Sequence, residues 1–229
     1  NFSDAVFALA ITLLLISTSP PSNFEQIRRF VYELIPFLLC IAIILIIWHE
    51  HYIFFYRYGL RSAKIIVLNT LFLSLLLFYV YPLKFLTRLI LFPIARLLHD
   101  DALLGSLNGI IATEDVGDLM IIYGIGAASV FFTLMLMYRY ALKLAVELEL
   151  NELEKFDTRV KIRTNLLMGA VPVLSVILAF IFYGSWLAGI IPGFTYFLYT
   201  PIMMIHRRYV DRNRRNFIDL QRTEGSNEL

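Results

Sequence analysis

The sequence predicts an all-α integral membrane protein with six transmembrane helices in a single domain that covers residues 1–229. Hydrophobic residues make up 59% of the chain and charged residues only 17%, whereas a water-soluble domain carries about 25% charged residues. The mean hydropathy is +0.72, and six separate apolar runs approach the roughly 20 residues that a helix needs to cross the hydrocarbon core. A net charge of +2 is too small to indicate nucleic acid, so membrane lipid is the expected surrounding.

The expected spans follow the apolar runs in chain order. The first is closed by a Ser-Thr-Ser-Pro-Pro segment at 17–21, a strong helix stop, and the third is closed by Pro82. The segment 83–98 is also apolar, but basic residues at helical spacing favour an amphipathic helix at the membrane surface over a seventh span. A continuous helix leaving the membrane is expected over 138–156. The six expected spans cover residues 3–17, 31–48, 65–81, 119–137, 166–183 and 187–205.

The distribution of Lys and Arg predicts the orientation of these spans. With a cytoplasmic N-terminus and six spans, the cytoplasmic loops and tail hold 15 of the 20 basic residues. Such a bias is typical of the cytoplasmic side of a membrane protein. Seven spans would place the arginine-rich tail outside, against this rule. Both termini of the multi-pass chain are therefore expected in the cytoplasm.

Polar side chains are expected to meet near the cytoplasmic ends of the first three spans. A carboxylate as close to hydrocarbon as Asp4 needs a partner. Asn69 lies about 7 Å into the third span at 1.5 Å per residue, so antiparallel packing would let Asp4 meet a histidine and Asn69 without an unpaired charge. His49 and His51 are both candidates, and the alternative is that both lie among lipid headgroups. The expected members besides the histidine are Ser3, Asp4, Trp48 and Asn69.

A second face of the first span carries large aliphatic residues. Leu9, Thr12, Leu13 and Ile16 are spaced i, i+3, i+4 and i+7 and therefore share one side of a helix. Asp4 lies about 140° away from Leu9 around the helix, given about 100° per residue. If several copies of this face met, they would form a narrow apolar pore with one ring of hydroxyls. The alternative is ordinary packing against lipid or a core, which is the commoner use of a leucine stripe.

Three motifs in the first three spans resemble one known family. One is an Arg-x-x-x-Phe-Ser-Asp signature at the start of a helix rich in Ala, Ile, Leu and Thr, whose Arg would precede Asn1. Another is Trp-x-x-His near the end of span two, whose spacing favours His51 over His49, and the third is Asn-x-x-Phe-Leu in span three. On these motifs the chain resembles prokaryotic members of the TMEM175 family of potassium channels. The matching residues are Phe2, Ser3, Asp4, Trp48, His51, Asn69, Phe72 and Leu73.

The resemblance implies a leaky potassium-selective channel in the plasma membrane of a prokaryote, with K⁺ as the permeant ion and no cofactor or metal site. Animal members look like two fused six-span repeats, so a chain with one repeat would form a homotetramer. Four first helices would then present Leu9 as the narrowest ring, Leu13 and Ile16 as further apolar rings, and Thr12 as a ring that aids selectivity. The resemblance also assigns Phe2 to the polar motif. The chain lacks the Thr-Val-Gly-Tyr-Gly carbonyl loop of ordinary potassium channels.

The main alternative is a secondary transporter of a small ion or solute. Helices broken by Gly and Pro often hold transported substrates. Against this alternative, spans four to six carry almost no ionisable residue at mid-depth. An enzyme is not expected, because His49 and His51 form only a weak metal pair and no nucleophile with a base is visible. The interrupting residues of spans five and six are Gly169, Pro172, Gly184, Gly189, Pro192 and Gly193.

Overall fold

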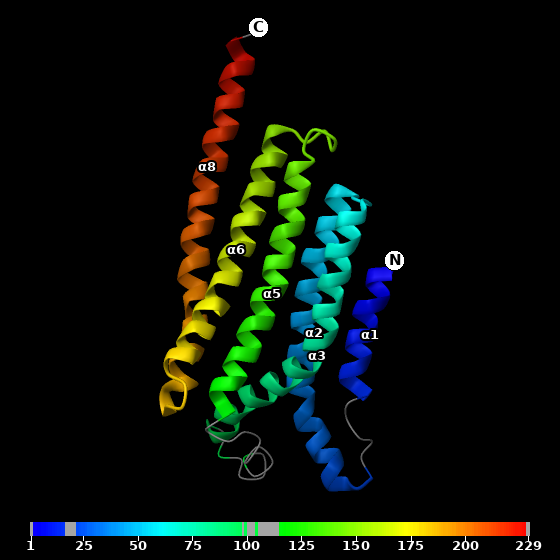
Figure 1. Ribbon diagram of the computed structural model, residues 1–229, viewed down its shortest axis with the longest axis vertical. Helices are drawn as coiled ribbons and strands as arrows, with labels where there is room; N and C mark the ends of the chain where they lie inside the picture. Colours follow the sequence, from blue (N-terminus) through cyan, green and yellow to red (C-terminus); the bar gives the residue numbers. More distant parts are fainter. Residues whose placement is uncertain (1, 17–21, 98, 100–103, 105–114, 228–229) are drawn as a thin grey trace. The chain divides into compact units, whose positions relative to one another are not determined.

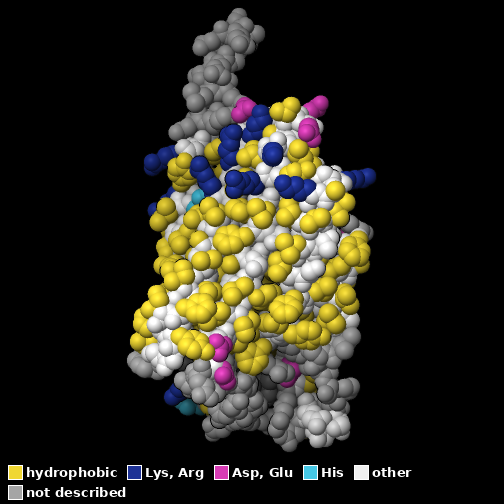
Figure 2. All heavy atoms as spheres, viewed as in Figure 1, with side chains coloured by type: hydrophobic (Ala, Val, Ile, Leu, Met, Phe, Trp, Pro, Cys, Tyr) yellow, Lys and Arg dark blue, Asp and Glu magenta, His cyan; other side chains and the backbone are white. Residues whose placement is uncertain are grey.

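The computed structural model describes residues 2–16, 22–97, 99, 104 and 115–227, and every regular element in these ranges is a helix. The expected all-α class is confirmed. Within the described ranges, four helices are long and apolar enough to cross a membrane, and the shorter N-terminal helix is also apolar. Apolar side chains cover most of the surface between the charged groups in Figure 2. The chain divides into two compact units, Asn1–Leu119 and Met120–Leu229.

The first unit contains α1 (Phe2–Ile16), α2 (Phe24–Tyr58) and α3 (Ala63–Leu97), each of which packs against the other two (Figure 1). The side chain of Asn23 accepts a hydrogen bond from the backbone N–H of Gln26 and caps the start of α2. Gly59 ends α2 with φ 55°, a left-handed conformation that glycine adopts without steric cost. The buried side chains between the three helices include Ala10, Leu14, Cys40, Ile44, Phe72 and Leu76.

The third expected span has a different end in the structure. Pro82 does not stop the helix, because α3 continues to Leu97. Figure 1 shows the last turns of α3 running at an angle to its first part. A proline inside a helix removes one backbone hydrogen bond and clashes with the preceding turn, and this bends a helix when neighbouring turns hold it in place. The apolar part that could cross a membrane is Ala63–Leu83, which agrees with a change of environment near Pro82.

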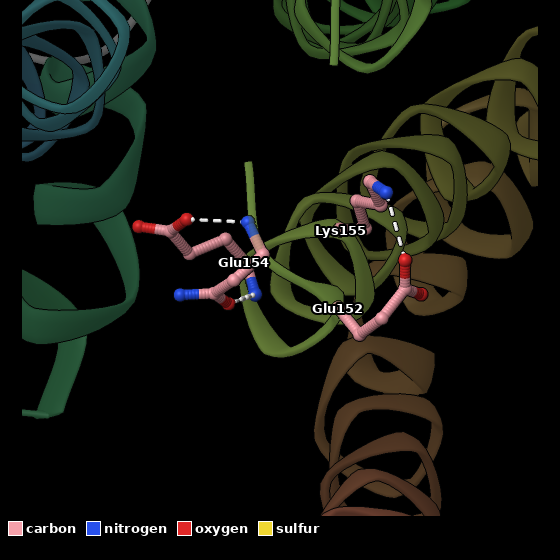
Figure 3. Close-up of polar contacts among 4 residues, drawn as sticks. Glu152, Glu154 and Lys155 are labelled. Carbon is pink, nitrogen blue, oxygen red and sulfur yellow. Dashed lines mark hydrogen bonds and ion pairs between the residues drawn. The ribbon is translucent and has the colours of Figure 1, made fainter. Parts of the chain in front are cut away.

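The second unit contains three long helices, α5 (Val116–Lys143), α6 (Glu152–Ile181) and α8 (Tyr199–Asn227). The expected continuous helix over 138–156 is wrong, because α5 ends at Lys143 and a turn precedes α6. A capping box starts α6: the side chain of Asn151 accepts from the N–H of Glu154, and the carboxylate of Glu154 accepts from the N–H of Asn151 (Figure 3). Lys155 also donates to Glu152 at 2.7 Å.

The sixth expected span, 187–205, is helical only in pieces. It consists of η2 (Trp186–Ala188), α7 (Ile190–Phe194), η3 (Thr195–Leu198) and the first turns of α8. The break has a local cause in Pro192, which has no N–H and lies beside Gly193. The carbonyl of Pro192 accepts from the hydroxyl of Thr195 at 2.6 Å and from that of Ser175 on α6 at 3.1 Å. The bond from Ser175 links the interrupted segment to α6, and the bond from Thr195 lies within that segment.

Two glycines allow α5 and α6 to approach closely. A Cβ atom added to Gly124 would lie 2.4 Å from Cγ2 of Val176 and 2.9 Å from the backbone oxygen of Pro172. A Cβ added to Gly169 would lie 2.6 Å from the ring of Phe132. Small residues at such positions are typical of helix pairs in membranes, where packing rather than water exclusion holds helices together.

We expect Gly124→Ala to destabilise the folded protein by about 1–3 kcal/mol, because the α6 backbone must move to admit the methyl group. The thermal unfolding midpoint of the protein in detergent measures this change. Gly193→Ala is the control, because a Cβ at Gly193 has no neighbour within 4 Å. An unchanged midpoint in the Gly124 variant would contradict the close α5–α6 contact.

Candidate pore-lining helix and its polar network

Helix α1 has one buried and one exposed face. The buried face packs on α2 and α3 and repeats every three or four residues, as expected for one side of a helix. The exposed face carries Leu9, with 47% of its surface accessible, and Thr12. The buried residues of α1 are Ser3, Val6, Phe7, Ala10 and Leu14.

Polar side chains from all three helices of the first unit meet at the N-terminal end of α1. The indole N–H of Trp48 on α2 donates to Oδ1 of Asp4 at 3.0 Å. Nδ2 of Asn69 on α3 donates to Oγ of Ser3 at 3.2 Å, and Oδ1 of Asn69 lies 2.7 Å from Nε2 of His51. Because Oδ1 is an acceptor, this pair requires Nε2 of His51 to carry a hydrogen. The structure thus brings Ser3, Asp4, Trp48, His51 and Asn69 together in one hydrogen-bonded region, hereafter the α1 network.

Aromatic rings surround His51 within this network. The imidazole is only 3% exposed, and it stacks on Phe72 of α3 with ring centroids 5.3 Å apart and an angle of 14°. Phe7 of α1 and Phe55 of α2 approach it at 5.5 and 4.8 Å. The ring therefore combines one short polar contact with packing against three aromatic side chains.

Depth in the membrane allowed either histidine and the motif spacing favoured His51, and the structure places His51 beside Asn69. His49 is exposed and lies about 200° away from His51 on the helix. Phe7 is a member of the site that sequence analysis missed. Its signal was available, because it lies one helical turn after Ser3 and therefore on the same face.

Phe2 is not part of the buried network, which corrects the expectation from the family motif. Its side chain is 76% exposed. The physical reason is angular: Phe2 is seven residues before Leu9, which places both on nearly the same side of the helix. Phe2 therefore belongs to the exposed face.

The candidate pore residues lie on that exposed face as far as it is described. The hydroxyl of Thr12 donates to the carbonyl oxygen of Ala8 at 2.9 Å, so the lone pairs of its oxygen remain available. Leu13 is half-buried, at the edge of the face. The side chain of Ile16 lies outside the described part of the structure.

Comparison with known proteins identifies the family of the chain. Residues 1–79 match the family described as endosomal/lysosomal potassium channel TMEM175. A protein of Marivirga tractuosa named "Potassium channel" is 42% identical over 229 residues, which cover 95% of this chain and 89% of that protein. The chain belongs to the TMEM175 family. A solved structure of the potassium channel MtTMEM175, a threonine-to-alanine variant in complex with a Nanobody-MBP fusion protein, matches with a TM-score of 0.81.

That structural match has 42% sequence identity and covers 92% of this chain and 91% of the solved one. The resemblance stated from the sequence motifs is therefore confirmed. TMEM175 relatives are potassium channels, so this chain belongs among channels and not among enzymes, and no cofactor is expected beside the permeant ion. The family match at 1–79 includes the whole of the α1 network.

Proposed function

We propose that this chain forms a leaky potassium-selective channel from four copies arranged around a pore that α1 lines. The observation that carries the proposal is the division of α1 into two faces. One face is fixed by aliphatic packing and by the α1 network. The other keeps leucine and threonine side chains uncovered within the protomer. A fixed helix with an uncovered apolar face is suited to meet copies of itself around an axis.

The Leu9 side chains form the proposed constriction, with Leu13 and Ile16 as further apolar rings. A narrow ring of hydrocarbon excludes water and blocks ions, because a partly dehydrated cation finds no ligands there. Opening then requires the four α1 helices to tilt or rotate apart. The α1 network supports this role by holding each helix on α2 and α3, so that the rings keep their positions.

Thr12 supplies the only hydroxyl on the exposed face of α1 over the described side chains 2–14. Because its proton is donated to the helix carbonyl of Ala8, its oxygen can turn lone pairs towards a cation. Four such oxygens are few and weak ligands. K⁺ gives up its hydration more easily than Na⁺, so this ring favours K⁺ modestly.

The membrane arrangement follows from the same proposal. The six expected spans make up one channel domain in this proposal, and residues 187–205 form the sixth crossing. The chain lies in the plasma membrane of a prokaryote with both termini in the cytoplasm, as the bias of basic residues supports.

Two measurements on the purified full chain test this function. The mass of the detergent-solubilised particle should equal that of four chains. In liposomes, K⁺ flux should follow its gradient and the imposed voltage, and a bi-ionic potential should show K⁺ preferred over Na⁺. Flux coupled in a fixed ratio to a second solute would instead support a secondary transporter.

We expect Thr12→Ala to reduce the preference for K⁺ over Na⁺ by roughly two- to fivefold while flux persists, which corresponds to a loss of about 0.5–1 kcal/mol of selective interaction. Reversal potentials in mixed K⁺ and Na⁺ measure this ratio. Thr12→Ser keeps the hydroxyl and should keep most of the preference, and Thr70→Ala removes an exposed threonine from α3 instead. An unchanged ratio in Thr12→Ala would assign selectivity to other residues.

A further inference from the structure

One side of α8 is fixed by polar contacts with α6. Oγ1 of Thr164 lies 3.1 Å from Nε2 of His206, and the guanidinium of Arg163 donates to the hydroxyl of Tyr209 at 3.5 Å. Further along, Arg214 forms an ion pair with Asp157 at 3.3 Å. These contacts define the face of α8 that packs on α6.

The opposite side of α8 changes from apolar to basic within one helical turn. At about 100° per residue, five of the residues from Met204 to Arg215 fall within an arc of about 100° centred close to Arg208. Met204 and Ile205 come first and are 51% and 68% exposed. Three exposed arginines follow, hereafter the arginine row. The arginine row consists of Arg208, Arg212 and Arg215.

We propose that the arginine row binds the phosphate groups of anionic phospholipids at the cytoplasmic surface of the membrane. The apolar residues suit acyl chains, and the arginines begin where hydrocarbon should end. Arg208 and Arg212 lie about 5 and 10 Å beyond Ile205 along the axis, at 1.5 Å per residue. The headgroup layer on each side of a bilayer is about 5–8 Å thick, so both long side chains reach it.

The side chains of the arginine row favour phosphate. A guanidinium presents a planar fork of donors that matches two phosphate oxygens. Arg215 also donates to the backbone carbonyl of Asp211 at 3.3 Å, so Arg208 and Arg212 are the members best placed for lipid. Asp211 is the one acidic residue of α8 up to Arg215, and it lies about 60° to the side of Arg208. Figure 2 shows Lys and Arg side chains gathered beyond the apolar surface, at the level where α6 begins in Figure 1.

A protein partner is a less suitable occupant for this surface. An interface between copies or with another chain would bury Met204 and Ile205 against a matching apolar surface and would need acids opposite the arginines. The switch from apolar to basic along the axis matches a bilayer instead, because a bilayer changes from acyl chain to phosphate in the same direction.

The test adds lipid to the full chain purified in detergent and follows its thermal unfolding midpoint. Phosphatidylglycerol should raise the midpoint more than phosphatidylcholine, because a ligand that binds only the folded state stabilises it. The double variant Arg208→Gln with Arg212→Gln should need about 25-fold more phosphatidylglycerol for the same rise, at about fivefold for each arginine. Arg208→Lys with Arg212→Lys keeps the charge but not the fork, and its response should lie between those of the parent and the glutamine variant.

The control is Arg139→Gln with Lys143→Gln on α5, which removes the same charge at the same i, i+4 spacing from two exposed residues. This control should respond to phosphatidylglycerol like the parent. An equal loss in the control would mean that only diffuse charge matters. An equal response to phosphatidylcholine, whose choline group neutralises its phosphate, would mean that the net negative charge of the headgroup does not matter. Either result overturns the proposal. So does a changed particle mass in the arginine variant, since that would place the row between copies of the chain.

Discussion

Replacing Leu9 with asparagine is expected to raise the basal K⁺ flux of the reconstituted protein on the order of tenfold or more. In the proposed pore, the Leu9 ring excludes water, and each 1.4 kcal/mol removed from a barrier raises a rate about tenfold. Four asparagine amides would hydrate the ring and offer oxygen ligands to a passing cation. Flux from K⁺-loaded liposomes, normalised to the amount of protein inserted, measures the change.

Leu71→Asn on α3 is a suitable control, because Leu71 is 48% exposed and Leu9 is 47% exposed. The Leu71 variant then adds a similar amount of polar surface to a helix face outside the proposed pore. This control should keep the basal flux of the parent. Parent-like flux in Leu9→Asn, with normal insertion and particle mass, would show that the constriction lies elsewhere. Equal increases in both variants would indicate leakage through damaged membranes.

The α1 network shows why part of the site could be predicted from sequence. A carboxylate, an indole, a histidine and an amide fall at one depth only if the first three helices are antiparallel, and each of them is costly to leave unpaired in hydrocarbon. The shared depth of these residues in the membrane therefore predicted that they would meet. Their angular positions around the helices determined which residues take part. His51 lies on the side of α2 that faces Asn69, and Phe2 lies on the side of α1 that faces away.

The boundaries of the later helices were harder to predict, for different reasons. Pro82 is a stop signal in isolation, but the hydrogen bonds of neighbouring turns let α3 continue through it. The break before α6 did have a local signal, since Asn151 and Glu154 have the spacing of a capping box. Pro192 and Gly193 signal the break in the sixth span, but the contact of this segment with α6 depends on Ser175, a residue distant in sequence, and no local pattern could predict that contact.

The proposed ring of Leu9 side chains would be formed by several chains, and this limits what a single sequence predicts. Helical spacing shows that Leu9 and Thr12 share a face, but lipid and a pore axis produce the same apolar pattern. The α1 network favours the pore axis over lipid, because it buries the opposite face of the helix against α2 and α3. For that reason the role of α1 depends on the residues that hold it as much as on those that it exposes.

His51→Ala should therefore have the largest effect on stability, with a loss of about 3 kcal/mol. The substitution empties a site enclosed by three aromatic rings and leaves Oδ1 of Asn69 without its imidazole partner. For a chain of this size, the unfolding midpoint should fall by roughly 10 °C. His51→Phe separates the two causes: it restores the ring contacts but not the hydrogen bond, so it should recover part of the loss. His49→Ala, on the exposed side of the same helix, should leave the midpoint within about 1–2 °C of the parent. Equal midpoints for the two alanine variants would mean that the contacts of His51 do not hold α1 in place, and the proposed fixed position of Leu9 would lose its support.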